Sequence, residues 1–118
     1  MAMKTSIRKE GAGDVVIVTL EGHLDFETTD TFRESLMRIE RTSAKSRIIF
    51  DLGALQFVGS SGISAFVQAL RDFNSRAATK PRYTNVKSEF KKIISAFDDK
   101  GSFEFWDNTE RALKSFDN

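Results

Sequence analysis

The sequence predicts an α/β domain with a small, mixed and mostly parallel β-sheet, and with helices packed mainly on one face of that sheet. Two observations carry this prediction. Short β-prone runs alternate along the chain with segments whose apolar residues recur at helical spacing. The seven Gly and the single Pro nowhere cluster into a linker, so residues 1–118 are expected to form one domain.

Two β-prone segments at the start of the chain predict a hairpin. Residues 14–21 read DVVIVTLE, a run rich in Val, and Gly22 is expected to end this strand. A first strand over residues 5–9 is expected to pair with it, through a turn at residues 11–13, Gly-Ala-Gly.

A helix and a buried strand are expected next. The apolar stripe of the helix consists of Phe32, Leu36 and Ile39. The residues that could cap its beginning are Asp25, Thr28, Asp30 and Thr31, the last with Glu34 at capping-box spacing. Residues 47–52, RIIFDL, suit a strand buried on both faces. Because a helix separates this strand from the one before it, the two strands are expected to lie parallel.

The segment 53–62 is predicted to be a loop that leads into a second amphipathic helix. The apolar stripe of that helix consists of Ile63, Phe66, Val67, Leu70 and Phe73. After a polar stretch, Pro81 is expected to open an edge strand that runs to about Val86.

The last part of the chain repeats this alternation. A third helical stripe consists of Val86, Phe90, Ile93, Ile94 and Phe97, with Ser88 as a possible N-cap and Gly101 as its end. Residues 103–106, FEFW, predict a short strand. Asp107 and Glu110 have capping-box spacing before a last helix. The apolar face of that helix consists of Ala112, Leu113 and Phe116.

The composition excludes several kinds of site. Without Cys there are no disulfides, thiolate metal sites or Cys nucleophiles, and a single His rules out His-rich metal sites. Eighteen basic and 17 acidic residues give a formal charge of +1, which does not indicate a nucleic-acid-binding surface. There is no signal-peptide pattern, and no apolar run approaches the roughly 20 residues of a membrane span. We therefore expect a cytoplasmic protein that is not inserted into a membrane and holds no metal or cofactor.

One predicted loop, residues 57–62 (FVGSSG), contains the residues that could have a chemical function. Ser60 and Ser61 are expected at the N-terminus of the following helix, where unpaired N–H groups and the helix dipole favour negative charge. A phosphate on Ser60 would add about −1.5 to −2 charge there and change what docks on the surface. A purely structural interpretation is also open, in which either Ser caps the helix and Gly59 and Gly62 supply turn geometry.

The same loop does not fit an enzyme. A nucleophile elbow needs G-x-S-x-G, but Val58 stands two positions before Ser60, and Ile63 stands two positions after Ser61. His23 is the only possible imidazole base, and it is interpreted as a surface or loop residue without a metal role. No Gly-Lys-Ser/Thr follows at P-loop spacing. We therefore expect a protein that is not an enzyme.

The chain resembles the STAS domain family, and most of all the stand-alone bacterial anti-sigma-factor antagonists. The matching pieces are residues 20–25 (LEGHLD), 48–52 (IIFDL), 55–62 (LQFVGSSG) and the segment from Val86 through Phe97 to Phe103. They follow in order and spacing along nearly the whole chain. The third piece, a loop in front of an apolar helix, is the most specific of them.

The resemblance implies a partner-switching regulator of transcription. In the family, the first Ser of an Asp-Ser-Ser-Gly motif is phosphorylated by a serine kinase of the histidine-kinase-like ATPase type, which doubles as the anti-sigma factor. The unphosphorylated antagonist binds that kinase and frees the sigma factor, and a metal-dependent serine phosphatase resets the switch. Carried over by position, the phosphoacceptor is Ser60. The implied partner-binding residues are Asp25, Phe57, Gly59, Ser60, Ser61 and Gly62.

Gly59 departs from the family pattern, because Asp usually stands just before the acceptor. Glycine removes a negative charge beside Ser60 and loosens the backbone. A second hypothesis follows from this departure: a STAS subunit that is not phosphorylated and serves as a scaffold in a larger assembly, such as a lipid-transport ABC complex. Phe26 and Phe57 are interpreted either as core residues or as exposed contacts for a partner.

Overall fold

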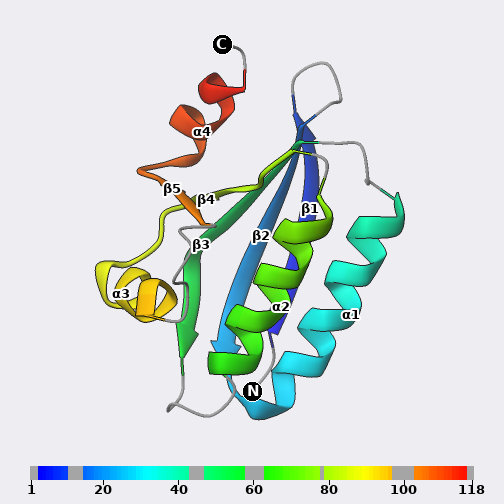
Figure 1. Ribbon diagram of the computed structural model, residues 1–118, viewed down its shortest axis with the longest axis vertical. Helices are drawn as coiled ribbons and strands as arrows, with labels where there is room; N and C mark the ends of the chain where they lie inside the picture. Colours follow the sequence, from blue (N-terminus) through cyan, green and yellow to red (C-terminus); the bar gives the residue numbers. More distant parts are fainter. Residues whose placement is uncertain are drawn as a thin grey trace.

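Strands and helices alternate along the part of the chain that the computed structural model describes, residues 3–10, 15–42, 47–57, 63–77, 79–96 and 103–116 (Figure 1). In chain order the elements are β1 (Met3–Glu10), β2 (Val15–Leu24), α1 (Phe26–Thr42), β3 (Arg47–Phe57), α2 (Ile63–Arg76), β4 (Arg82–Thr84), α3 (Ser88–Ala96), β5 (Glu104–Trp106) and α4 (Thr109–Ser115). From β2 onward, a helix therefore separates each strand from the next.

The strands stand in the sheet in the same order as in the chain, from β1 to β5. β1 and β2 are antiparallel, and the three other neighbouring pairs are parallel. Parallel neighbours need a crossover connection, which α1, α2 and α3 supply in turn. This confirms the α/β class and the mixed, mostly parallel sheet that the sequence predicts.

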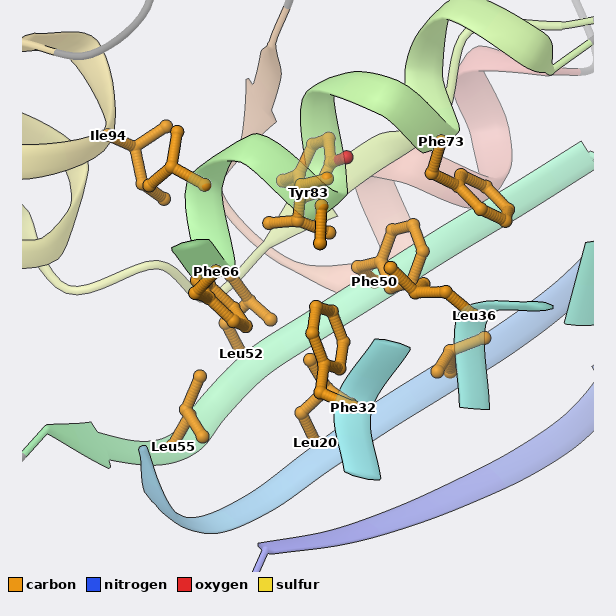
Figure 2. Packing of buried hydrophobic residues seen from close by; sticks show 14 of the residues in the cluster. Leu20, Phe32, Leu36, Phe50, Leu52, Leu55, Phe66, Phe73, Tyr83 and Ile94 are labelled. Carbon is orange, nitrogen blue, oxygen red and sulfur yellow. The ribbon is translucent and has the colours of Figure 1, made fainter. Parts of the chain in front are cut away.

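The main core lies between the sheet and the helices α1, α2 and α3. In Figure 2, aromatic and aliphatic side chains from helices and strands meet in this layer. The ring of Phe50 on β3 lies 5.2 Å from that of Tyr83 and 5.5 Å from that of Phe73. Phe32 of α1 and Phe66 of α2 have ring centroids 4.7 Å apart. Each such pair adds about 0.5–1.5 kcal/mol to the stabilisation from burial alone. Aromatic packing therefore connects α2 to β3 and α1 to α2.

The helical periodicity of the sequence is confirmed for both of these helices. In α1, the buried residues of the predicted stripe are Phe32, Leu36 and Ile39. In α2, they are Ile63, Phe66, Val67, Leu70 and Phe73. Every residue of the two predicted stripes is therefore in the core.

α4 packs on the opposite face of the sheet from α1 and α2, so the helices cover mainly, but not only, one face. On this face lies a second, smaller apolar core. It consists of Val15, Ile17, Ile49 and Ala112, with Trp106, Leu113 and Phe116 packed against it. Two arginines hold the end of α4: Arg82 lies 4.5 Å from the ring centroid of Phe116, and Arg47 donates to the Phe116 carbonyl at 2.8 Å. β3 is consequently buried on both faces, as its sequence predicts.

Three strands run further than predicted: β1 spans Met3–Glu10 and not residues 5–9, and β2 and β3 continue past their predicted ends. β2 continues through Gly22, which has a φ of 102°, and β3 continues through Gly53. The two added segments pair with each other: after a β-bulge in β3, residues 21–24 lie opposite residues 54–57. Glycine adopts a positive φ without steric cost, so Gly22 bends the strand rather than ending it. The loop prediction is therefore wrong for residues 53–57.

β4 is an interior strand, contrary to the prediction of an edge. It lies between β3 and β5, and it ends at Thr84, short of the predicted Val86. The N–H that Pro81 lacks is not needed, because Pro81 precedes the first paired residue of the strand. The predicted hairpin turn at residues 11–13 and the predicted helix end at residues 97–101 lie outside the described residues.

Two predicted helix caps are displaced by one residue. Asn108, and not Asp107, caps α4, since its side chain accepts a backbone N–H at 2.9 Å. In α3, the carbonyl of Lys87 accepts from the N–H of Lys91 at 2.8 Å. The residue whose carbonyl accepts the first helical bond is the N-cap, so Ser88 is already inside the helix.

Candidate functional site

The carboxyl ends of β2 and β3 lie side by side at one end of the sheet. Leu24, the last residue of β2, is opposite Phe57, the last residue of β3. α1 begins at Phe26, and α2 begins at Ile63. In open α/β sheets, ligand and regulatory sites lie at this carboxyl edge. The predicted site residue Asp25 is at this edge, between β2 and α1.

Asp25 caps α1 through two reciprocal hydrogen bonds with Thr28. Oδ1 of Asp25 accepts from the backbone N–H of Thr28 at 2.9 Å, and Oγ1 of Thr28 accepts from the backbone N–H of Asp25 at 3.0 Å. The pair is a capping box in which Asp and Thr replace the usual Ser/Thr and Glu/Gln. Asp30 and Thr31, two other predicted caps, lie inside the helix. The capping prediction is therefore correct for Asp25, whereas Thr28 lies inside the helix as its capping-box partner.

Two threonines fix the backbone at Asp25. Oγ1 of Thr29 donates to the Asp25 carbonyl at 2.9 Å, and Oγ1 of Thr28 points to the carbonyls of His23 and Asp25, each at 3.2 Å. Thr28 and Thr29 are 6% and 4% exposed, whereas Asp25 is half-buried. The arrangement holds the Asp25 carboxylate in one orientation at the surface of the carboxyl edge.

Most of the predicted loop site lies outside the described residues. These are Gly59, Ser60, Ser61 and Gly62. For Phe57, the structure describes the backbone at the end of β3, and for Phe26 the backbone at the beginning of α1. Of the predicted partner-binding residues, the structure therefore brings together Asp25 and the Phe57 backbone. The roles of the others stay predictions.

A polar cluster that the sequence analysis missed steadies the connection from β4 to α3. Oδ1 of Asp51 accepts from the N–H of Gly53 at 3.0 Å and from the side-chain amide of Asn85 at 3.1 Å. Asn85 follows β4 with a φ of 57°, and a Cβ on Gly53 would lie 3.1 Å from the Asn85 Cβ. The Asp-x-Gly spacing was the available signal, because Asp side chains often bond the N–H two residues on.

A small hollow lies between the carboxyl end of β3 and the beginning of α3. Its lining residues are Leu55, Gln56, Lys87, Glu89 and Phe90. Leu55 and Phe90 are buried and form an apolar floor, while the three polar residues are exposed at the rim. The volume is about 190 Å³, below the roughly 300–1,000 Å³ of pockets that enclose small molecules. This hollow is therefore smaller than a typical small-molecule site.

The described residues contain neither a group of side chains that could bind a metal ion nor a helix that could span a membrane. Among them, no three or more His, Asp or Glu side chains are grouped so that they could hold a metal ion. None of the helices in the described ranges combines the length and the apolar character that crossing a membrane requires. The described part of the carboxyl edge consists of the fixed polar groups around Asp25 and the hollow beside Phe90.

Comparison with known proteins assigns this fold and this arrangement to one family. Residues 6–112 match the model of the STAS domain. The chain belongs to the STAS domain family, which confirms the resemblance inferred from its motifs.

Solved structures of bacterial anti-sigma-factor antagonists share the fold. One from Mycobacterium paratuberculosis is 15% identical, with a TM-score of 0.79 over 98% of this chain and 95% of that chain. A variant of RsbS from Moorella thermoacetica is 20% identical, with a TM-score of 0.74 over 98% and 96%. The phosphorylated form of the Bacillus cell fate determinant SpoIIAA is 18% identical, with a TM-score of 0.65 over 96% and 99%. At these identities, the likeness shows the fold.

Proposed function

We propose that this chain is a partner-switching regulator of the anti-sigma-factor-antagonist type. In its unphosphorylated form it binds a serine kinase that acts as the anti-sigma factor, and phosphorylation of Ser60 releases it. A metal-dependent serine phosphatase restores the binding form. The chain itself acts as a binding module and not as an enzyme. Support comes from membership of the STAS family and from structural likeness to antagonists, one of them solved in a phosphorylated form.

The observation that carries the proposal is the geometry of the chain on either side of Ser60. β3 ends at Phe57, three residues before Ser60 in the sequence, and α2 begins at Ile63, three residues after it. The beginning of a helix favours negative charge through its unpaired N–H groups and its dipole. A serine so close to a helix start is a suitable acceptor, because a phosphate there need not unfold the domain.

Charge explains how a phosphate would release the partner. The edge already carries the fixed carboxylate of Asp25 and the exposed Glu27 in the first turn of α1. A phosphate on Ser60 adds about −1.5 to −2 charge at neutral pH. The phosphate adds to the negative charges already on this edge, and it must lose bound water when the partner docks. Both effects oppose binding. Binding should therefore weaken while the fold remains intact.

The test compares three substitutions in binding to the cognate serine kinase of the histidine-kinase-like ATPase type. Ser60→Ala should bind as the unmodified chain does, whereas Ser60→Asp should weaken binding about tenfold or more. Ser64→Asp is the matched control, since Ser64 is exposed in the first turn of α2 and the substitution adds the same charge. Equal binding by Ser60→Asp and Ser60→Ala would show that the mechanism is wrong. Intact-mass spectrometry of the chain from its native cells should find a phosphate on Ser60 whose occupancy changes with growth conditions.

A second candidate function is a scaffolding subunit without a covalent switch. Gly59 favours it, because the family pattern has Asp at that position and the kinase loses a recognition contact. This candidate requires an unmodified Ser60 in every growth condition and stable co-purification with a larger assembly, such as a transporter ATPase. A phosphate on Ser60 at high occupancy would rule it out.

A further inference from the structure

The second core is separate from the main core. In the described part of the chain, α1, α2 and α3 contribute side chains to the main core, whereas α4 contributes to the second one. The boundary falls inside β5, because Phe105 packs against the main core and its neighbour Trp106 packs against the second. Two exposed residues, Asp107 and Asn108, then lead into α4. Removing α4 from the sheet would therefore leave the packing of the main core in place.

The helical form of α4 depends on its contact with the sheet. α4 has seven residues, and isolated helices shorter than about 12–15 residues are marginal in water. Its contact is also small: Ala112 is buried, whereas Leu113 and Phe116 are half-buried. The sheet residues below it, Ile17 and Ile49, are 2% and 0% exposed. A short helix with a small contact therefore keeps two large aliphatic side chains away from water.

Two arginines hold the last turn of α4 through contacts that are each weak. The Phe116 ring has the guanidinium carbons of Arg82 and Arg47 at 4.5 and 5.7 Å from its centroid. Arg47 also donates to the Phe116 carbonyl at 2.8 Å, and Nε of Arg82 donates to Oγ of Ser115 at 3.2 Å. These arginines begin β3 and β4, so α4 is held at the end of the sheet away from the carboxyl ends of β2 and β3 (Figure 1). Each contact is small beside the stability of a whole domain.

We infer that α4 is a cover that opens and closes on the folded domain, about a hinge at residues 107–108. The closed form buries Ile17 and Ile49, and the open form presents them to solvent. A unit with few buried contacts opens at a lower free energy than the whole domain unfolds. The exposure of this second apolar surface is therefore set by the contacts of Phe116 and not by global unfolding. The cover lies away from the Ser60 region, so the inference stands whether or not Ser60 is phosphorylated.

The test places one thiol below α4 and a matched one on the other face of the same strand. The chain contains no Cys, so a single introduced Cys reports on one position. Ile49 and Ile48 are neighbours on β3, both are buried, and they belong to the second and the main core respectively. The alkylation rate with iodoacetamide, divided by the rate of the same variant unfolded in urea, should be at least about tenfold higher for Ile49→Cys than for Ile48→Cys. With added urea, the rate for Ile49→Cys should rise less steeply than global unfolding requires.

Variants of α4 test whether the Phe116 contacts set the opening. Phe116→Leu keeps an apolar side chain but removes the ring between the guanidinium groups. It should speed alkylation of Ile49→Cys about fivefold and leave that of Ile48→Cys unchanged. Lys114→Ala is the control, because it removes only a solvent-exposed ion pair with Glu110, at 3.5 Å, and should change the rate less than about twofold.

Hydrogen exchange tests the cover in the unmodified chain, so the inference does not depend on how well a Cys variant folds. The Ala112 amide, which donates to the Asn108 carbonyl at 3.1 Å, should exchange at least about a hundredfold faster, relative to its unfolded rate, than the paired amides of β2 and β3. Equal protection of α4 and of these strands would overturn the inference. So would equal normalised alkylation of the two Cys variants, or a urea dependence for Ile49→Cys that matches global unfolding.

Discussion

Removing the Asp25 carboxylate tests the capped edge directly. In Asp25→Ala, the N–H of Thr28 loses its acceptor at 2.9 Å, and the beginning of α1 loses a negative charge. Loss of an N-cap costs about 1 kcal/mol, within a range of about 0.5–2. The charge near the helix N-terminus contributes about 0.3–1 kcal/mol more. We therefore expect Asp25→Ala to lower the free energy of unfolding by about 1–2 kcal/mol.

Urea unfolding, followed by the fluorescence of Trp106, the only Trp, gives this value. Asp25→Asn is the matched control, since Asn caps as well as Asp but carries no charge, and it should cost less than 1 kcal/mol. Combining Asp25→Ala with Thr28→Val should cost less than the sum of the single changes, because the two residues share their bonds. An Asp25→Ala chain as stable as the original would refute the capping argument. If Asp25→Asn keeps its stability but changes kinase affinity, the charge itself contacts the partner.

Three further predictions concern packing, and thermal unfolding by circular dichroism checks the first two. Gly53→Ala should destabilise the fold by about 1–2 kcal/mol, because the new Cβ would lie 3.1 Å from the Asn85 Cβ. An unchanged Tm would show that the backbone accommodates the added methyl group without cost. Phe50→Ala should cost about 3–5 kcal/mol, since the side chain is fully buried between aromatic rings; a loss below 1 kcal/mol would contradict that packing. Arg82→Gln should speed amide exchange in α4 more than in α2, because the guanidinium over the Phe116 ring helps to hold α4; uniform exchange would count against this role.

Helical periodicity predicted the core well, because it records which side of an element faces away from water. The apolar stripe from Ile63 to Phe73 could be predicted without knowing which elements pack against it. All five of its residues are buried. The same holds for the strand that begins at Arg47, where a continuous apolar run indicated burial on both faces. Asp25 was among the predicted caps because Asp is a favoured N-cap residue, whereas its reciprocal bonds with Thr28 were not predicted.

What the sequence could not predict depends on pairing between distant segments. Gly22 and Gly53 are usual strand breakers, but here the two strands continue past them because each supplies the other with partners. Similarly, nothing local to β4 shows that β5 pairs on its outer side. The cap of α4 was missed for a different reason: Asp107 and Asn108 are both good caps, and local preference does not choose between neighbours.

The sequential order of the strands also bears on how the chain folds during synthesis. Each strand pairs with the one made just before it, so loop closures are short and the sheet can grow from the N-terminus as the chain leaves the ribosome. α4 is made after all five strands, yet it covers Ile17 and Ile49 on the face of the sheet opposite α1 and α2. Until α4 docks, the nascent domain exposes an apolar strip, and we expect chaperone binding and aggregation risk to be greatest in that interval.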